Sequence, residues 1–146
     1  MEPVKFKRLD PAAILPTYAT PGSAGADLYA LPSGEPVVIA PGATACIRTG
    51  LAAAIPCGYV GLVFARSGLA CRQGLAPANK VGVVDSDYRG EINVVLHNHG
   101  SVPQTIENGE RVAQLLITPV LQLAYEVAET LTDTDRNAGG FGSTGK

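Results

Sequence analysis

The chain has 146 residues, of which 46% are hydrophobic, and its 11 basic and 13 acidic residues give a formal net charge of −2. This length fits one domain with its own core, and the 17 glycines and 11 prolines exclude a helix bundle. Since no run of like charges occurs, a nucleic-acid-binding or anionic-membrane surface is not expected.

Short apolar and β-branched segments alternate with turns along most of the chain. Turn signals such as PGSAG, IPCG and ENGE separate them. Strands are expected at residues 4–9, 26–31, 36–39, 44–55, 58–64, 82–84, 91–98, 104–106, 111–118 and 122–127. One short helix is expected at residues 67–73. Many short strands at such spacing predict an all-β sandwich, barrel or jelly roll.

The character of the chain changes near its C-terminus. The stretch ETLTDTDRNAGGFGSTGK contains few apolar side chains, so it cannot bury enough area to offset its ordering entropy. We therefore expect a β-domain at residues 1–129 and a flexible arm at residues 130–146. The tip, GGFGSTGK, fits most of the phosphate-loop pattern G-x-x-x-x-G-K-[ST], but neither a buried strand nor a helix flanks it. It is predicted to bind phosphate as a lid.

The cysteines and the N-terminal stretch indicate a cytoplasmic protein. Cys46, Cys57 and Cys71 form no C-x-x-C pair, which favours reduced thiols in or near the core over disulfides or a thiolate metal site. The start, MEPVKFKRLDP, lacks the apolar region of a signal peptide. The longest nearly apolar stretch, residues 51–65, contains Pro56 and is too short to span a bilayer.

Two polar motifs stand where strands begin or end. SAGADLYA places Asp27 at the start of a strand, and FARSGLA places Arg66 and Ser67 at a strand-to-helix junction. A guanidinium, a hydroxyl and helix-end N–H groups could there converge on one anion. Taken singly, each motif fits ordinary turn or capping chemistry equally well.

A third motif, GVVDSDYRGE, runs from an apolar strand into a polar hairpin turn. Asp85 at the strand end could activate a water molecule or hold a divalent cation, with simple turn chemistry as the alternative. ENGERVAQLL carries Arg111 and Gln114 on what could also be an ordinary strand edge. His97 and His99 alternate along a strand without a third ligand nearby, which disfavours a metal role.

The order of the motifs is more specific than any one of them. SAGADLYA, ARSGLA, NKVGVVDSDYRGE, GERVAQLL and RNAGGFGSTG, spread over residues 23–145, together resemble the five-motif pattern of the trimeric dUTPases. The resemblance implies a distorted β jelly roll assembled as a homotrimer, with active sites at subunit interfaces. It implies hydrolysis of dUTP to dUMP and pyrophosphate with Mg²⁺, which limits uracil incorporation into DNA and supplies dUMP for thymidylate synthesis. No nucleic acid or membrane partner is implied.

The resemblance also implies roles for individual residues. Asp85 would orient and activate the water that attacks the α-phosphate, and Asp27 would support the Mg²⁺-triphosphate through water. Asn79 would read the uracil edge, and Tyr88 would pack under the deoxyribose and exclude a 2′-hydroxyl. The other substrate-binding residues expected from the motifs are Arg66, Ser67, Gly68, Val83, Val84, Asn93, Gln114, Arg136, Phe141, Gly142, Ser143 and Thr144.

Two positions depart from the pattern, and two other functions compete. Asn137 stands where members often carry glycine, and Lys80 beside Asn79 is not set by the motif. A dCTP deaminase on the same fold would lack the DSDYRG run and would release ammonia. A non-catalytic β-trimer that sequesters nucleotide would need neither the candidate base nor the arm.

Overall fold

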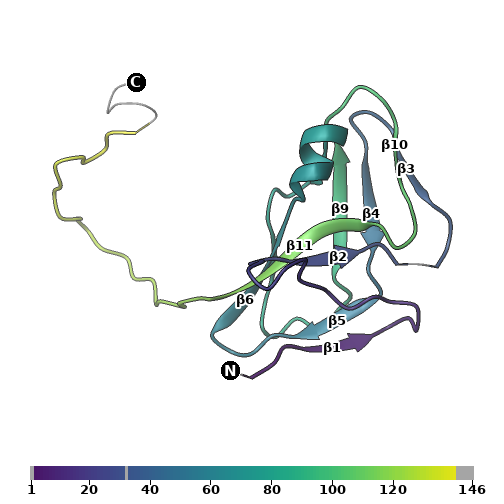
Figure 1. Cartoon of the computed structure of the whole chain (residues 1–146). Coiled ribbons are helices and arrows are strands. Elements are labelled where there is room, and N and C mark those ends of the chain that lie inside the picture. The colour runs from purple at the N-terminus through teal and green to yellow at the C-terminus, as the bar shows by residue number, and fades with distance from the viewer. Residues whose placement is uncertain (1, 32, 141–146) are drawn as a thin grey trace.

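The computed structural model of the chain describes residues 2–31 and 33–140. These residues form eleven strands and one short π-helical turn, η1 (Leu69–Gln73), arranged as a β body with a long C-terminal extension (Figure 1). The all-β jelly-roll prediction is confirmed. The strands are β1 (Lys5–Arg8), β2 (Ala26–Tyr29), β3 (Val37–Ile39), β4 (Thr44–Arg48), β5 (Leu51–Ala54), β6 (Tyr59–Phe64), β7 (Leu75–Pro77), β8 (Gly82–Val84), β9 (Asn93–Asn98), β10 (Gln104–Ile106) and β11 (Arg111–Pro119).

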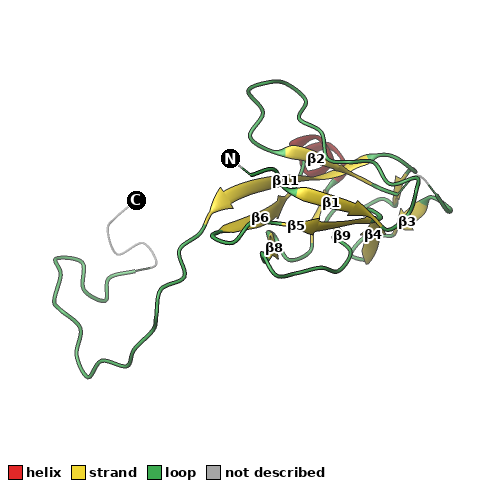
Figure 2. Cartoon of the chain, turned by 90° about the horizontal axis from the view of Figure 1, so that it is seen from below, coloured by secondary structure: helices red, strands yellow, loops and turns green. Residues whose placement is uncertain are grey.

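The strands pair antiparallel in four small sheets. The largest has the order β2-β11-β6-β8, and a second has the order β4-β9-β7. The pairs β1-β5 and β3-β10 complete the body (Figure 2). One core of buried aliphatic side chains, including Leu28, Leu96 and Val112, lies among them. Burial of each such side chain stabilises the fold by about 1.5–3 kcal/mol.

The central strand β9 shows how the sequence builds this core. Val94 and Leu96 are buried while Asn93 and Val95 are exposed, the period-two pattern of a strand with one covered face. Asn98 is also fully buried. Its amide donates to the carbonyls of Ile39 at 2.9 Å and Val102 at 2.8 Å and accepts from the Gly100 N–H at 2.9 Å, so no desolvation cost is left uncompensated.

Several local expectations are corrected. The strand expected at residues 44–55 is broken into β4 and β5 at Gly50, whose φ of 69° few other residues adopt. The short strand β7 was missed because three residues ending in proline carry no alternation. The helix expected at residues 67–73 is present, with Ser67 and Gly68 helical and leading directly into η1. All three cysteines are exposed rather than near the core.

The strand expected at residues 122–127 is wrong. As far as residue 140, no strand follows β11, which ends at Pro119. Residues 121–138 leave the body (Figures 1 and 2), and their side chains are exposed. Leu123, Tyr125 and Val127 alternate as a strand would, but the described chain offers them no neighbouring edge. Pattern alone therefore does not make a strand here.

Candidate active site

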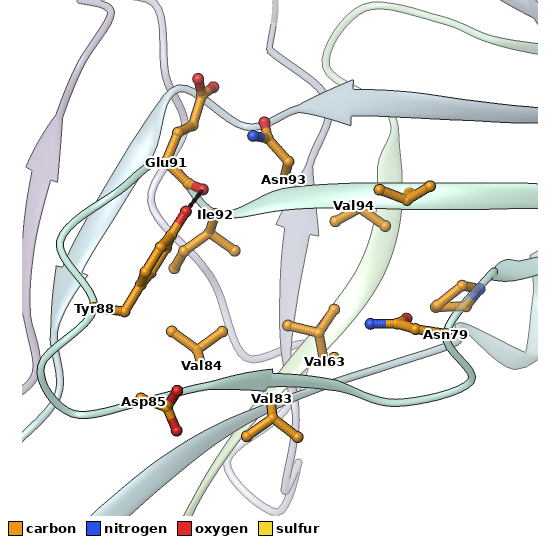
Figure 3. Close-up of a pocket in the computed structure, with 13 residues that line it drawn as sticks. Val63, Asn79, Val83, Val84, Asp85, Tyr88, Glu91, Ile92, Asn93 and Val94 are labelled. Carbon is orange, nitrogen blue, oxygen red and sulfur yellow. Dashed lines mark hydrogen bonds between the residues drawn. The ribbon is translucent and has the colours of Figure 1, made fainter.

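A hairpin pocket lies between β8 and β9, on the segment that carried the third motif. It has a volume of about 240 Å³, and its lining includes Asn79, Val84, Asp85, Tyr88 and Asn93. Figure 3 shows Tyr88 closing one end of the pocket and Asn79 reaching in from the other. Small-molecule sites usually hold about 300–1,000 Å³, so this pocket matches part of a nucleotide better than a whole one.

The strand β8 presents its two faces differently. The Val84 side chain points into the pocket, whereas that of Val83 lies on the other side of the strand (Figure 3). Gly82 lets β8 approach β6 closely, since a Cβ there would lie 3.1 Å from the Cβ of Val63. Because β8 is the edge strand of its sheet, the outer main-chain groups of this strand are available to a ligand, and backbone dipoles cannot rotate to suit a wrong one.

The turn after β8 is held by its own hydrogen bonds. The Tyr88 N–H donates to the carbonyl of Asp85 at 3.2 Å. The Arg89 guanidinium donates to the carbonyls of Ser86 at 2.7 Å and Tyr88 at 2.9 Å. The Asp85 side chain is exposed and has no hydrogen bond among the described residues, so its carboxylate is free to accept one from a water molecule.

A second cluster, the arginine cluster, is formed by Asp27, Arg66, Arg111 and Gln114. Asp27 is buried and accepts hydrogen bonds from Arg66 Nε at 2.9 Å and from Arg111 Nη1 at 3.3 Å. A β-bulge lies between Arg111 and Ala113 on β11. The Gln114 side chain packs on Gly25, because a Cβ atom added at Gly25 would lie 3.2 Å from the Cβ of Gln114. One buried carboxylate therefore orients two guanidinium groups.

The two clusters are far apart within one chain. In the strand register, Asp27 on β2 stands opposite Gln114 on β11, and Gln114 stands opposite Phe64 on β6. Asp85 follows Val84 on β8, and Val84 stands opposite Gly61, near the other end of β6. Three strand spacings across the sheet and four residues along it place Asp85 about 19 Å from Asp27. No described residue of the arginine cluster lines the hairpin pocket. The candidate residues thus form two separate half-sites.

Comparison with known proteins shows the family of the chain. The dUTPase family model matches residues 12–145. The chain belongs to the dUTPase family. The deoxyuridine 5'-triphosphate nucleotidohydrolases of Syntrophotalea carbinolica and Maricaulis maris are 49% and 50% identical to it, over 97% and 98% of this chain and 96% of each relative. The dUTPase of Staphylococcus bacteriophage 80alpha with dUPNHPP superposes with a TM-score of 0.91 at 28% identity, over 100% of both chains.

The remaining dUTPase motif residues fall outside both clusters. Ser67 is exposed, and Gly68 caps η1 at the end of the loop that follows β6. Arg136 lies on the C-terminal extension, where its Nε donates to the carbonyl of Gly139 at 2.9 Å. Phe141, Gly142, Ser143 and Thr144 lie outside the described residues.

Both departures from the dUTPase motifs have unusual backbone geometry. Lys80 has a φ of 68° and Asn137 a φ of 40°, the only positive values among non-glycine residues in the described ranges. Asparagine tolerates the left-handed region better than most residues. Asn137 has a positive φ, a region open to asparagine as well as to glycine, and its Oδ1 accepts a hydrogen bond from the Thr134 N–H at 3.0 Å.

The histidines stand apart from both half-sites of this dUTPase. The rings of His97 and His99 lie 4.3 Å apart. Partial desolvation, together with the neighbouring charges of His97 and Lys80, lowers the pKa of His99 below its ordinary value of 6.5. Within residues 2–31 and 33–140, no three His, Cys, Asp or Glu side chains cluster as metal ligands would. The same residues contain no helix long and apolar enough to cross a membrane.

One polar residue of the pocket was missed by sequence reasoning, as were several apolar ones. Glu91 lines the hairpin pocket, and its carboxylate accepts from the Gly50 N–H at 2.8 Å and from Arg48. A glutamate just after a turn has no distinctive local signal, because its partners stand about forty residues earlier in the chain.

Proposed function

We propose that the hairpin pocket is the deoxyuridine-binding part of a dUTP diphosphatase active site. As a member of the dUTPase family, the enzyme hydrolyses dUTP to dUMP and pyrophosphate, which limits uracil incorporation into DNA and supplies dUMP for thymidylate synthesis. The observation that carries the proposal is the single pocket that brings Asn79, Asp85 and Tyr88 together. We place this activity in the cytoplasm.

Each pocket residue has a role that its position supports. Asn79 and the main chain of β8 would read the uracil edge, with Asn93 on the opposite strand and Val84 against the base. A mismatched buried donor or acceptor would cost about 1–3 kcal/mol. Tyr88 would pack against the deoxyribose and leave no space for a 2′-hydroxyl.

Asp85 would be the general base. Its exposed carboxylate stands at the end of β8, on the rim of the pocket. It would accept a proton from the water that attacks the α-phosphate, with pyrophosphate as the leaving group. General-base catalysis of this kind contributes about 10²–10⁴-fold to a rate.

The arginine cluster would bind the triphosphate from a neighbouring copy of the chain. A separation of about 19 Å between Asp27 and Asp85 is too great for one copy to supply both groups to a single α-phosphate. We therefore propose a homotrimer whose sites combine the pocket of one copy with Arg66, Ser67, Gly68 and Gln114 of another. A cyclic trimer repeats one head-to-tail interface around a closed axis, so each of its three interfaces would form the same shared site.

Magnesium and the C-terminal arm would complete the site. Mg²⁺ would be held mainly by the triphosphate, where it would neutralise charge on the phosphate oxygens. Each Asp27 oxygen keeps acceptor capacity beyond its arginine bond, so Asp27 could support the ion through water. Arg136, Phe141, Gly142, Ser143 and Thr144 would close over the bound nucleotide.

A nucleotide panel tests the activity. Pyrophosphate release from dUTP should exceed that from dTTP, dCTP and UTP, and it should be lost when EDTA removes Mg²⁺. Asp85→Asn should retain dUTP binding and lower kcat by about 10²–10⁴-fold. Comparable rates on all four nucleotides, an unchanged kcat for Asp85→Asn, or ammonia release from dCTP would contradict the proposal.

Mixing two inactive variants tests the shared site. If Asp85 and Arg66 act from different copies, trimers mixed from Asp85→Asn and Arg66→Gln chains contain some intact sites. Equal random mixing should restore activity to about a quarter of the wild-type level. Each variant alone is the control, after gel filtration has shown that it assembles. No recovery from verified mixed trimers would place both residues in one copy's site.

A further inference from the structure

The return side of the hairpin pocket is tied to the corner between β4 and β5. Glu91 accepts from the Gly50 N–H at 2.8 Å through Oε1, and the Arg48 Nε lies 3.2 Å from both carboxylate oxygens. The Glu91 side chain is only 17% exposed. These charge-assisted bonds are therefore stronger than those of a fully solvated carboxylate.

The next residue is held by the same corner. Ile92 donates its N–H to the carbonyl of Leu51 at 2.8 Å, and its carbonyl accepts from the buried Thr49 hydroxyl at 2.6 Å. Gly50 itself cannot shift easily, because a Cβ there would lie 2.7 Å from Leu31 Cδ1 and its φ is 69°. The position of the Gly50 N–H that donates to Glu91 is therefore fixed by packing in the core.

Tyr88 rests on this anchored segment. Its hydroxyl donates to the carbonyl of Glu91 at 3.0 Å. Its ring lies against Gly90, where a Cβ would come within 2.6 Å of the ring Cζ. Figure 3 shows the Tyr88 hydroxyl meeting Glu91 across the end of the pocket. Since Tyr88 is 45% exposed, few other contacts hold its ring.

We propose that Glu91 is a positioning residue for Tyr88 and thereby sets the preference for deoxyribose over ribose. The inference rests on the proposed function, in which the Tyr88 ring excludes the 2′-hydroxyl. A ring that must reject one hydroxyl group has to stay in place to within a fraction of that group's size. Without the Glu91 side chain, the main-chain carbonyl that Tyr88 bonds is held to the corner only through Ile92, and the turn itself has only its internal bonds among Asp85, Ser86, Tyr88 and Arg89.

The backbone bond to Gly50, rather than the pair with Arg48, carries this anchoring. Arg48 is 59% exposed, and exposed ion pairs contribute little, about 0–1 kcal/mol. Glu91→Gln keeps a carbonyl oxygen that can accept from the Gly50 N–H, whereas Glu91→Ala loses it. Glu91→Asp keeps the charge but shortens the side chain by one methylene, which takes the carboxylate out of reach of Gly50.

The test is kcat and KM for dUTP and UTP in each variant. Misplacement of a binding group by about 1 Å can change kcat/KM by up to about a hundredfold. We therefore expect kcat/KM for UTP, divided by kcat/KM for dUTP, to rise at least about tenfold in Glu91→Ala and Glu91→Asp. The effect should lie mainly in KM, since Asp85 precedes the anchored segment. Glu91→Gln should stay within about threefold of wild type.

Glu110→Ala is the matched control. Glu110 also accepts a backbone N–H, that of Glu107 at 3.0 Å, in a turn away from the pocket, so its loss should leave nucleotide selectivity unchanged. Wild-type selectivity in Glu91→Asp, or an equal change in Glu110→Ala, would overturn the inference. If Glu91→Ala does not fold, Glu91→Asp decides. A wild-type enzyme inactive on dUTP would instead refute the proposed function.

Discussion

Replacing Asp27 with asparagine should loosen the arginine cluster. Asp27 Oδ1 accepts from Arg66 at 2.9 Å and Oδ2 from Arg111 at 3.3 Å. An asparagine of the same shape replaces one of these oxygens by an NH₂ group, which is a donor. One guanidinium then loses its acceptor and faces a donor instead.

The exposure of the partners sets the magnitude. Removing one partner from a fully buried ion pair costs about 3–5 kcal/mol. Here Asp27 is 6% exposed, but Arg66 is 22% and Arg111 50% exposed, so water can solvate the released guanidinium. We therefore expect a loss of about 2 kcal/mol. At about 3 °C per kcal/mol for a domain of this size, Tm should fall by about 6 °C.

Calorimetric unfolding at a fixed protein concentration measures this shift, since assembly makes Tm concentration-dependent. Asp133→Asn, on the exposed C-terminal extension, is the control. The double variant Asp27→Asn with Arg66→Gln should lose less than the sum of the single losses, because the two residues contact each other. A Tm equal to that of the control would show that the Asp27 charge does not organise the cluster.

Two further predictions concern stability, each measured as a urea unfolding midpoint. Gly61→Ala should destabilise the folded protein by about 1–3 kcal/mol through overpacking, because the added Cβ would lie 2.8 Å from Ile55 Cδ1. Gly22→Ala is the control and should behave as wild type, since no atom lies within 4 Å of its added Cβ. Equal midpoints for these two variants would contradict the packing argument. Lys80→Gly should stabilise the folded protein by up to about 1 kcal/mol. The left-handed conformation at φ 68° costs a non-glycine residue about 1–2 kcal/mol. Removing that cost outweighs the about 0.5–1 kcal/mol of chain entropy that a glycine loses on folding. A lower midpoint would show that this conformation carries no strain.

The hairpin pocket could be predicted from the sequence because its parts are close together in the chain. Asn79, Asp85 and Tyr88 lie within ten positions of one another, on the segments directly before and after β8. Apolar alternation and turn residues specify such a unit locally. The many short strands predicted an all-β fold, and the order of the five motifs then indicated the family and its jelly roll.

Only the tertiary structure decided which distant groups meet. The pairing of Asp27 with Arg66 and Arg111 depends on the strand order β2-β11-β6, and the Glu91 anchor depends on a corner about forty residues away. The alternating residues 122–127 form no strand because no strand edge of the described residues lies beside them. Local sequence sets turns and faces, whereas strand neighbours come from packing the whole core. The same strand order keeps the two half-sites of one chain about 19 Å apart.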